Sequence, residues 1–171
     1  QQYDVGDPRQ LESTADFLLY FLNQVRENYD YIIVDTQPTR DSMILSNALV
    51  AADYVLIPMM CDSFSEDSAF RTYSICNELR KNPKTNLKGI GVILTMVDKG
   101  AATRETREEC QRVLGPALFK TEIPSALAVK TSVRRCVPVC YSAKTQPIGK
   151  SYVAAYKELK QRLEKLDKEE K

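Results

Sequence analysis

Residues 29–38 read Tyr29-Asp-Tyr-Ile-Ile-Val-Asp-Thr-Gln-Pro38, and this stretch decides the fold that the sequence predicts. Its centre, Tyr31–Val34, is a short apolar run rich in β-branched residues, which is typical of a strand with both faces buried in a parallel sheet. Asp35 closes the run, and a Thr-Gln-Pro turn follows it. The pattern predicts a central strand with a carboxylate at its carboxyl end.

The rest of the chain alternates between helical and strand patterns. Further apolar strands are expected at residues 54–58, 89–94 and 118–123, with a brief extended piece at 138–140. Helices are expected at residues 7–27, 42–52, 66–82, 104–114 and 125–135, followed by a last helix with an apolar stripe from Tyr152 to Leu166. Strands separated by helices indicate βαβ units. We therefore expect a single α/β domain over residues 1–171, built on a doubly wound, mostly parallel sheet.

The composition excludes several function classes. Hydrophobic residues make up 43% of the 171 residues and charged residues 27%, which is globular rather than disordered or collagen-like. The chain has no histidine, so it cannot form a Ser-His-Asp or Cys-His catalytic site. The five cysteines come without a secretory signal, and no apolar run approaches the roughly 18 residues of a membrane span. These features predict reduced thiols, a cytoplasmic location and no membrane attachment.

Asp35 is the first candidate for chemistry. Four apolar residues followed by an aspartate form the Walker B pattern, in which the carboxylate supports Mg²⁺ on a bound nucleotide. The same residue could instead cap a loop through its side-chain oxygens. The motif alone leaves both interpretations open.

A basic stretch follows later in the chain. Between Ile123 and Lys157 there is no acidic residue, and the segment carries six cations. Such a segment favours phosphate-bearing partners, although a solvated surface would look the same in the sequence. The candidate DNA-binding residues are Lys130, Arg134, Arg135, Lys144 and Lys150.

Several blocks of the chain together resemble the ParA/MinD family of deviant Walker ATPases, and most closely its ParA/Soj partition branch. The blocks are Tyr29-Asp-Tyr-Ile-Ile-Val-Asp-Thr-Gln-Pro38, Asn47-Ala-Leu-Val-Ala-Ala-Asp53, Val55-Leu-Ile-Pro58, Gly91-Val-Ile-Leu-Thr-Met-Val-Asp98 and Phe119-Lys-Thr-Glu-Ile-Pro124, in the family's order and at similar spacing. The resemblance implies a P-loop NTPase-like fold of the deviant Walker type.

The resemblance also implies roles for individual residues. Asp35 matches the catalytic Walker B aspartate, which holds Mg²⁺ through water, and Thr36, Gln37 and Pro38 match the switch loop, where Gln37 replaces the family's first proline. The implied cofactor-binding residues, which would lie beside the adenine base, are Thr95, Asp98, Ile123, Pro124 and Ser125. Ala128 and Thr131 replace an arginine and a glutamate that the family often carries, so DNA-binding residues do not transfer directly.

The family's glycine-rich phosphate loop, K-G-G-x-G-K-[ST], is missing from these 171 residues. We therefore expect a C-terminal portion of a ParA-like ATPase domain that lacks the P-loop strand. Enzymatic activity is left uncertain: the intact protein would bind ATP or ADP with Mg²⁺, whereas this chain alone would be inactive, with no nucleotide bound. Gly149-Lys-Ser151 looks like the end of a phosphate loop, but the chemistry of a helix N-terminus explains it adequately, with Ser151 or Gly149 near the cap.

The implied function is plasmid or chromosome partitioning by an ATP-switched homodimer that binds DNA non-specifically and is stimulated by a ParB-like partner. The alternatives are a non-catalytic interaction module and a MinD-like positioning or regulatory ATPase. The last eight residues carry charges of both signs and one leucine, which is unlike the amphipathic membrane helix of the MinD branch.

Overall fold

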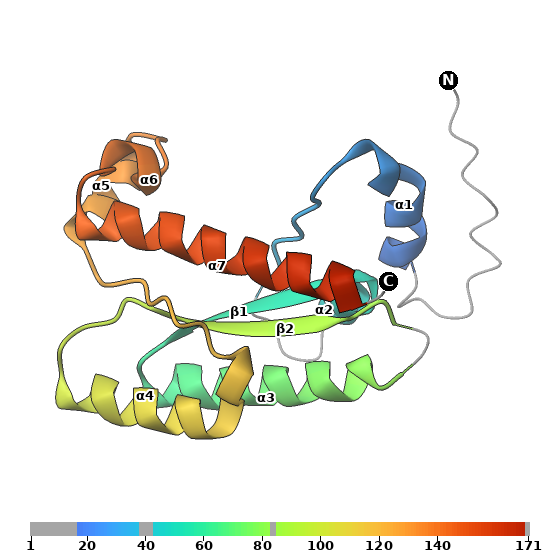
Figure 1. Cartoon of the computed structure of the whole chain (residues 1–171), viewed down its shortest axis with the longest axis horizontal. Helices are drawn as coiled ribbons and strands as arrows, with labels where there is room; N and C mark the ends of the chain where they lie inside the picture. Colours follow the sequence, from blue (N-terminus) through green and yellow to red (C-terminus); the bar gives the residue numbers. More distant parts are fainter. Residues whose placement is uncertain (1–16, 38–42, 83–84, 170–171) are drawn as a thin grey trace. The chain divides into compact units, whose positions relative to one another are not determined.

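The computed structural model describes residues 17–37, 43–82 and 85–169 (Figure 1). The chain divides into two compact units, which are described separately. The first unit comprises Gln1–Val55 and Cys76–Lys88, and the second comprises Leu56–Ile75 and Gly89–Lys171. The expectation that all 171 residues form one domain stays a prediction.

The described part of the first unit contains two helices, a 3-10 turn and the last residues of a further helix at 63–80. Helix α1 spans Phe17–Val25 and is followed by η3, Arg26–Asn28, and helix α2 spans Met43–Ala51. The backbone N–H of Leu18 donates to Asn47 Oδ1 at 3.2 Å, which joins α1 to α2. The predicted helices at 7–27 and 42–52 are confirmed within residues 17–25 and 43–51, and the remainder of the first lies outside the described residues.

The predicted strand at Tyr31–Asp35 is wrong for this structure. Residues 31–37 form no strand, and Ile33 is 91% exposed to solvent. A strand persists only where its backbone N–H and C=O groups pair with a neighbour, and no described residue pairs with this segment. The apolar run therefore has the composition of a buried strand without the partner that would bury it.

The second unit is built on a sheet in which β2, Gly89–Thr95, lies beside β1, Tyr54–Met60. Every residue of β2 except the last is buried, as its unbroken apolar sequence predicts for a parallel sheet. The predicted strand at 118–123 appears only as two isolated parallel bridges, Val92 with Leu118 and Val97 with Pro124. Backbone bonds Phe119 N–H to Val92 O and Ile123 N–H to Leu94 O keep this segment alongside β2.

Helices cover both faces of β2 within the second unit. Helix α4, Ala101–Leu114, which runs into η4, Gly115–Ala117, lies on one side with the first part of α3, Ser63–Arg80 (Figure 1). Helix α3 begins where Asp62 accepts the backbone N–H of Ser65 at 2.9 Å, a common way to satisfy the first turn of a helix.

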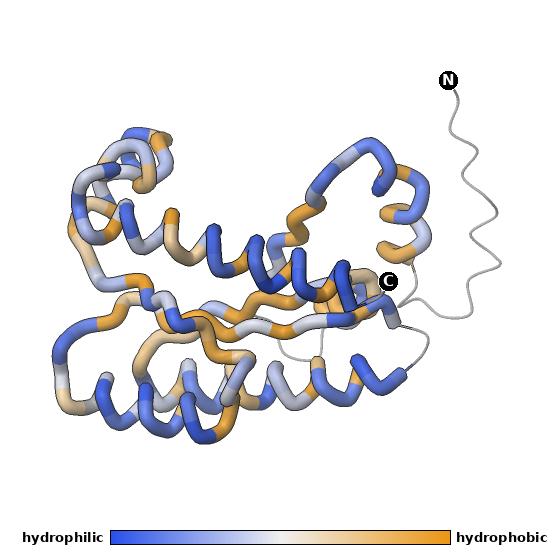
Figure 2. The backbone as a smooth tube through the Cα atoms, in the orientation of Figure 1, coloured by the Kyte–Doolittle hydropathy of each residue, from blue (hydrophilic) through white to orange (hydrophobic). Residues whose placement is uncertain are grey.

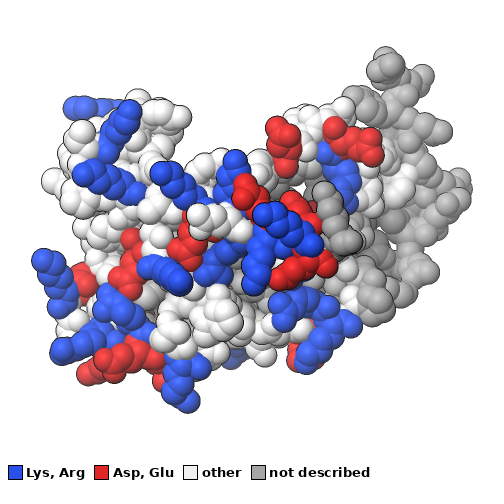
Figure 3. Space-filling view, in the orientation of Figure 1, with Lys and Arg blue, Asp and Glu red and all other residues white. Residues whose placement is uncertain are grey.

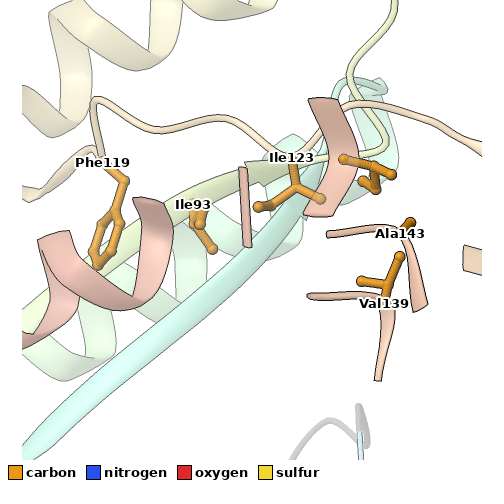
Figure 4. Close-up of a cluster of buried hydrophobic side chains, with 6 residues drawn as sticks. Ile93, Phe119, Ile123, Val139 and Ala143 are labelled. Carbon is orange, nitrogen blue, oxygen red and sulfur yellow. The ribbon is translucent and has the colours of Figure 1, made fainter. Parts of the chain in front are cut away.

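Helix α7, Pro147–Glu169, lies on the other side of the sheet (Figure 1). It alternates between hydrophilic and hydrophobic residues along its length (Figure 2), and Ala155 and Leu159 pack against the core. That core cluster consists of Ile93, Phe119, Ile123, Val139, Ala143 and Ile148 (Figure 4). The stripe predicted to face the core holds only in part: Leu159, Leu163 and Leu166 are half-buried, whereas Tyr152 and Tyr156 at its start are exposed.

Two short helices precede α7. Helix α5 spans Leu127–Arg134, which confirms the helix predicted at 125–135, and α6 spans Val139–Ser142. The extended piece predicted at 138–140 is therefore wrong. Pro138 has an extended backbone and its carbonyl accepts the N–H groups of Tyr141 and Ser142, so the proline starts a helical turn instead of a strand.

The Gly149-Lys-Ser151 stretch lies in the first turn of α7 and has a packing explanation. A Cβ atom placed on Gly149 would lie 2.2 Å from the backbone oxygen of Ala143, so only glycine fits there. Ser151 Oγ donates to the carbonyl of Pro147 at 3.0 Å within the same turn. These contacts account for the glycine and the serine without a phosphate ligand.

Candidate functional site

The carboxyl end of β2 carries a tight, strained turn. Thr95 Oγ1 donates to the carbonyl of Met59 at 3.2 Å, which joins the ends of β1 and β2. Met96 follows with φ of 53°, a left-handed conformation that side chains other than glycine adopt at some cost in energy. The turn directs the N–H of Val97 to the carbonyl of Ile123, 3.0 Å away. Ligands of open α/β sheets bind at this end of the strands.

The loop Ile123–Ser125 is held against this turn by backbone bonds. Ile123 N–H donates to Leu94 O at 2.9 Å, and Ser125 N–H donates to Val97 O at 3.0 Å. The side chain of Ile123 is 5% exposed and lies in the core cluster near Ile93 (Figure 4). We call the paired segments Leu94–Val97 and Ile123–Ser125 the strand-end ledge. It brings together four of the five residues expected beside the base, namely Thr95, Ile123, Pro124 and Ser125.

Asp98, the fifth residue expected beside the base, accepts hydrogen bonds at the start of α4. Its Oδ1 atom accepts the N–H of Gly100 at 2.8 Å and the hydroxyl of Thr103. The Thr103 hydrogen bond, followed by the Gly100 bond, lowers the pKa of Asp98 below its usual range, which keeps it ionised. One carboxylate oxygen is thus committed to Gly100 and Thr103 at the start of α4, contacts that the T-M-V-D motif does not reveal.

An ion pair that the sequence did not single out supports the same loop. Arg107 on α4 binds Glu122 through two bonds, Nε to Oε1 at 2.5 Å and Nη2 to Oε2 at 2.8 Å. Such a bidentate pair fixes the orientation of both side chains. Because Glu122 immediately precedes Ile123, the pair ties α4 to the strand-end ledge. The only sequence signal was the position of Glu122 inside the K-T-E-I-P block.

A hollow of about 290 Å³ opens beside this ion pair and is lined by Asp98, Lys99, Gly100, Arg104 and Arg107. Half-buried Cys61, at the end of β1, lies near the same groups. Burial, and then the negative charge of Glu122, raise the pKa of its thiol, so that the sulfur is protonated at neutral pH. Cys61 is therefore an inert thiol in this surrounding.

Asp35 belongs to the first unit. It is exposed, as is Gln37, whereas Thr36 is half-buried, and Pro38 lies outside the described residues. Asp35 forms no ion pair or hydrogen bond with any described residue, so its carboxylate is open to water. Within residues 17–37, 43–82 and 85–169, no group of three or more Cys, Asp or Glu side chains could hold a metal ion directly.

The predicted DNA-binding residues lie at one end of the second unit. Lys130 and Arg134 project from α5, and all five predicted cations are exposed. None of the five forms an ion pair within the part of the chain that the structure describes. Figure 3 shows lysine and arginine without acidic neighbours over α5 and α6.

The sequence of this chain is similar to those of known proteins. A family described as AAA domain matches residues 8–89. The sporulation initiation inhibitor protein Soj of Bacillus subtilis is 34% identical over 106 residues, which cover 60% of this chain and 41% of Soj. The chromosome partitioning protein ParA of Myxococcus xanthus is 29% identical over 143 residues, which cover 82% of this chain and 50% of ParA.

The chain belongs to the ParA/Soj family. It spans about half the length of the curated relatives it matches.

Solved structures give the fold of this ParA/Soj chain independently. It superposes on apo McdA from Cyanthece with a TM-score of 0.74 over 85% of this chain and 59% of McdA, at 22% identity. It also superposes on a plasmid partition protein from Borrelia burgdorferi with a TM-score of 0.62, at 22% identity, over 91% of this chain and 56% of that protein. The predicted α/β fold with a parallel sheet is thereby confirmed.

Among the described residues of this ParA/Soj chain, no helix is both long and apolar enough to cross a bilayer.

Proposed function

We propose that the protein carrying this ParA/Soj chain is an ATPase that partitions plasmids or chromosomes. In this proposal it works as a homodimer that binds DNA without sequence preference in its ATP-bound form, and a ParB-like partner stimulates hydrolysis. The observation that carries the proposal is the strand-end ledge, because its backbone is fixed at the end of the sheet where α/β proteins bind ligands.

The strand-end ledge would hold the base end of the nucleotide. Ser125 is exposed there, and the loop around it presents backbone groups whose positions are fixed by the bonds to Leu94 and Val97. Thr95 is half-buried and already donates to Met59 O, so its remaining capacity is as an acceptor. Asp98 would contribute only through Oδ2, since Oδ1 already accepts the Gly100 N–H and the Thr103 hydroxyl.

Asp35 would hold the Mg²⁺ of the bound nucleotide through water, and Thr36, Gln37 and Pro38 would form the loop that senses hydrolysis. The metal, when bound, would neutralise charge on the phosphates. Asp35 itself would orient water molecules, for which its exposed carboxylate is suited. With Gln37 in place of a proline, the switch loop has one backbone N–H more than the family pattern.

DNA would be bound by Lys130, Arg134, Arg135, Lys144 and Lys150. Non-specific binding needs mobile cations that neutralise phosphates and release counterions, and no base-reading geometry. The five side chains are exposed, and none is neutralised by a described acidic residue. Residues 123–157 contain no acid that would repel a phosphate.

The experiment that tests the proposed chemistry measures ATP turnover by the protein as its gene encodes it. Asp35→Ala is expected to abolish hydrolysis, because water-mediated support of Mg²⁺ is lost. Asp30→Ala is the matched control, since Asp30 is an exposed aspartate in the same segment that falls outside the motif, and it should retain the wild-type rate. Equal turnover in wild type and Asp35→Ala would remove Asp35 from the site.

A further inference from the structure

The outward face of α5 carries exposed apolar side chains as well as cations. Leu127 is 76% exposed and Val133 is 71% exposed, while Ser132 on the opposite side is buried. At 3.6 residues per turn, Lys130 and Arg134 lie about 40° apart around the helix axis. Leu127 lies about 20° beyond Arg134, and Val133 about 60° beyond Lys130. The face therefore has a basic centre with an apolar residue on each side.

This order of side chains discriminates between kinds of partner. Duplex DNA would engage the cations through its phosphates and leave Leu127 and Val133 in water. A membrane surface favours the reverse order, with apolar side chains in the centre and cations at the border. An amphipathic protein helix with an acidic row between two apolar rows would pair with every part of the face.

We propose that the outward face of α5 docks an acidic, amphipathic helix of a partner protein. Glutamates or aspartates of the partner would pair with Lys130 and Arg134, and apolar side chains beside them would cover Leu127 and Val133. Charge complementarity supports this occupant, because no acidic residue of the segment 123–157 competes for the two cations. Covering the apolar side chains excludes water from the ion pairs, which strengthens them.

The helix is well placed to act as a rigid docking surface. Val129 and Ala128 pack against the core cluster, and Ser132 Oγ donates to the carbonyl of Val129 at 2.8 Å. The outward side chains are thus presented on a backbone that is fixed from behind. Because the cations are shared with the proposed DNA surface, the docked helix and DNA would exclude each other.

The test uses a synthetic helix of about 15 residues, long enough to form a stable helix in a favourable sequence. It carries glutamates at i, i+3, i+4 and i+7 with leucines on both sides. Its binding to the full chain is measured by fluorescence anisotropy, and a peptide with glutamine in place of glutamate controls for the charge. The double variants Leu127→Ser/Val133→Ser and Lys130→Gln/Arg134→Gln should each weaken peptide binding by about tenfold.

Matched controls separate this surface from general effects. Phe64→Ser removes an equally exposed apolar side chain from α3, and Lys165→Gln/Lys168→Gln removes two cations from the end of α7. Both should leave peptide binding unchanged. In a parallel measurement with a DNA duplex, only the Lys130→Gln/Arg134→Gln variant should lose affinity.

The outcomes that overturn the proposal are distinct from failure of the partition function. No measurable peptide binding to the wild type, or unchanged binding in Leu127→Ser/Val133→Ser, would show that the apolar side chains are not part of a docking face. Binding of anionic phospholipid vesicles that is lost in the same variant would assign the face to membranes instead. None of these results bears on ATP turnover or on its dependence on Asp35, which are measured separately.

Discussion

Glu158 and Arg162, one turn apart on α7, form an ion pair of 2.9 Å, and both also bind the backbone of the segment that leads into the strand-end ledge. Glu158 accepts the N–H groups of Lys120 and Thr121, each at 2.9 Å. Burial disfavours the charged carboxylate, but these bonds outweigh it, and the pKa of Glu158 falls below its usual range. The last helix therefore helps to position the candidate base site.

Glu158 and Arg162 together form a clamp on residues 116–121, and Arg162 supplies the second half of its contacts. It donates through Nη1 to Pro116 O at 2.9 Å and through Nη2 to Leu118 O at 2.8 Å, and its guanidinium carbon lies 4.3 Å from the centre of the Phe119 ring. Arg162→Ala removes the donor to the carbonyls of Pro116 and Leu118 and leaves Glu158 with only its two backbone N–H partners, so we expect a loss of about 2–3 kcal/mol in unfolding free energy. Urea denaturation measures it.

Lys165→Ala is the matched control for Arg162→Ala. Lys165 pairs with Glu169 at 3.6 Å, but its side chain is 77% exposed. Exposed pairs of this kind contribute about 0–1 kcal/mol. An equal loss in both variants would mean that the clamp adds nothing beyond ordinary surface charge.

Acid should weaken the clamp. Because the folded-state pKa of Glu158 lies below the unfolded value near 4.5, its contribution is fully present above that pH and is lost as the pH falls through the folded-state value. The stability difference between wild type and Glu158→Gln should be largest at neutral pH and shrink below about pH 4.5. Thermal unfolding at several pH values measures it, and a difference independent of pH would contradict the assignment.

Ile33 and Ile93 provide a matched pair, since both lie in segments with the sequence of a buried strand. Ile33 is 91% exposed and Ile93 is 6% exposed. Ile93→Ala should destabilise the 171-residue chain by about 2–5 kcal/mol, because it removes buried methylenes and leaves a cavity. Ile33→Ala should change it by less than about 0.5 kcal/mol. Denaturant unfolding followed by far-UV circular dichroism measures both changes. A comparable loss of stability in Ile33→Ala would place that residue in the core.

Gly149 tests the packing explanation of the Gly-Lys-Ser stretch. Gly149→Ala places a Cβ against the carbonyl of Ala143 and should cost about 1–3 kcal/mol of stability, despite alanine's higher helix propensity. Ser151→Ala, in the same turn, should cost less than about 1 kcal/mol. Thermal unfolding measures both. A more stable Gly149→Ala variant would show that the two backbones do not approach as described.

The sequence predicted correctly those elements whose packing partners are present in the same unit. β2 is confirmed because its continuous apolar run is buried by β1, by the segment 118–124 and by helices of the same unit. Tyr31–Val34 has the same composition but no strand beside it among the described residues, and composition does not report pairing. At 138–140, the proline marked the start of a helical turn, which the three residues Pro-Val-Cys alone do not reveal.

The candidate site was predicted as a set of positions and not as a set of contacts. The T-M-V-D and I-P-S blocks were both expected at the ends of extended segments. The structure brings them together, because those segments lie side by side. The bonds from Gly100 and Thr103 to Asp98 depend on the length of the loop before α4, and the Arg107–Glu122 pair depends on how α4 packs. Both are tertiary relationships between residues 5–15 positions apart, which no periodicity encodes.

The most direct test of the central claim measures DNA affinity of the gene-encoded protein in ATP and in ADP, using one duplex of arbitrary sequence across a range of salt. We predict tight, salt-dependent binding with ATP and little binding with ADP. Arg134→Glu/Arg135→Glu should weaken the ATP-dependent binding and flatten its salt dependence, because fewer counterions are released. Equal DNA affinity in ATP and ADP would contradict the proposal that this ParA/Soj chain belongs to a nucleotide-switched partition protein.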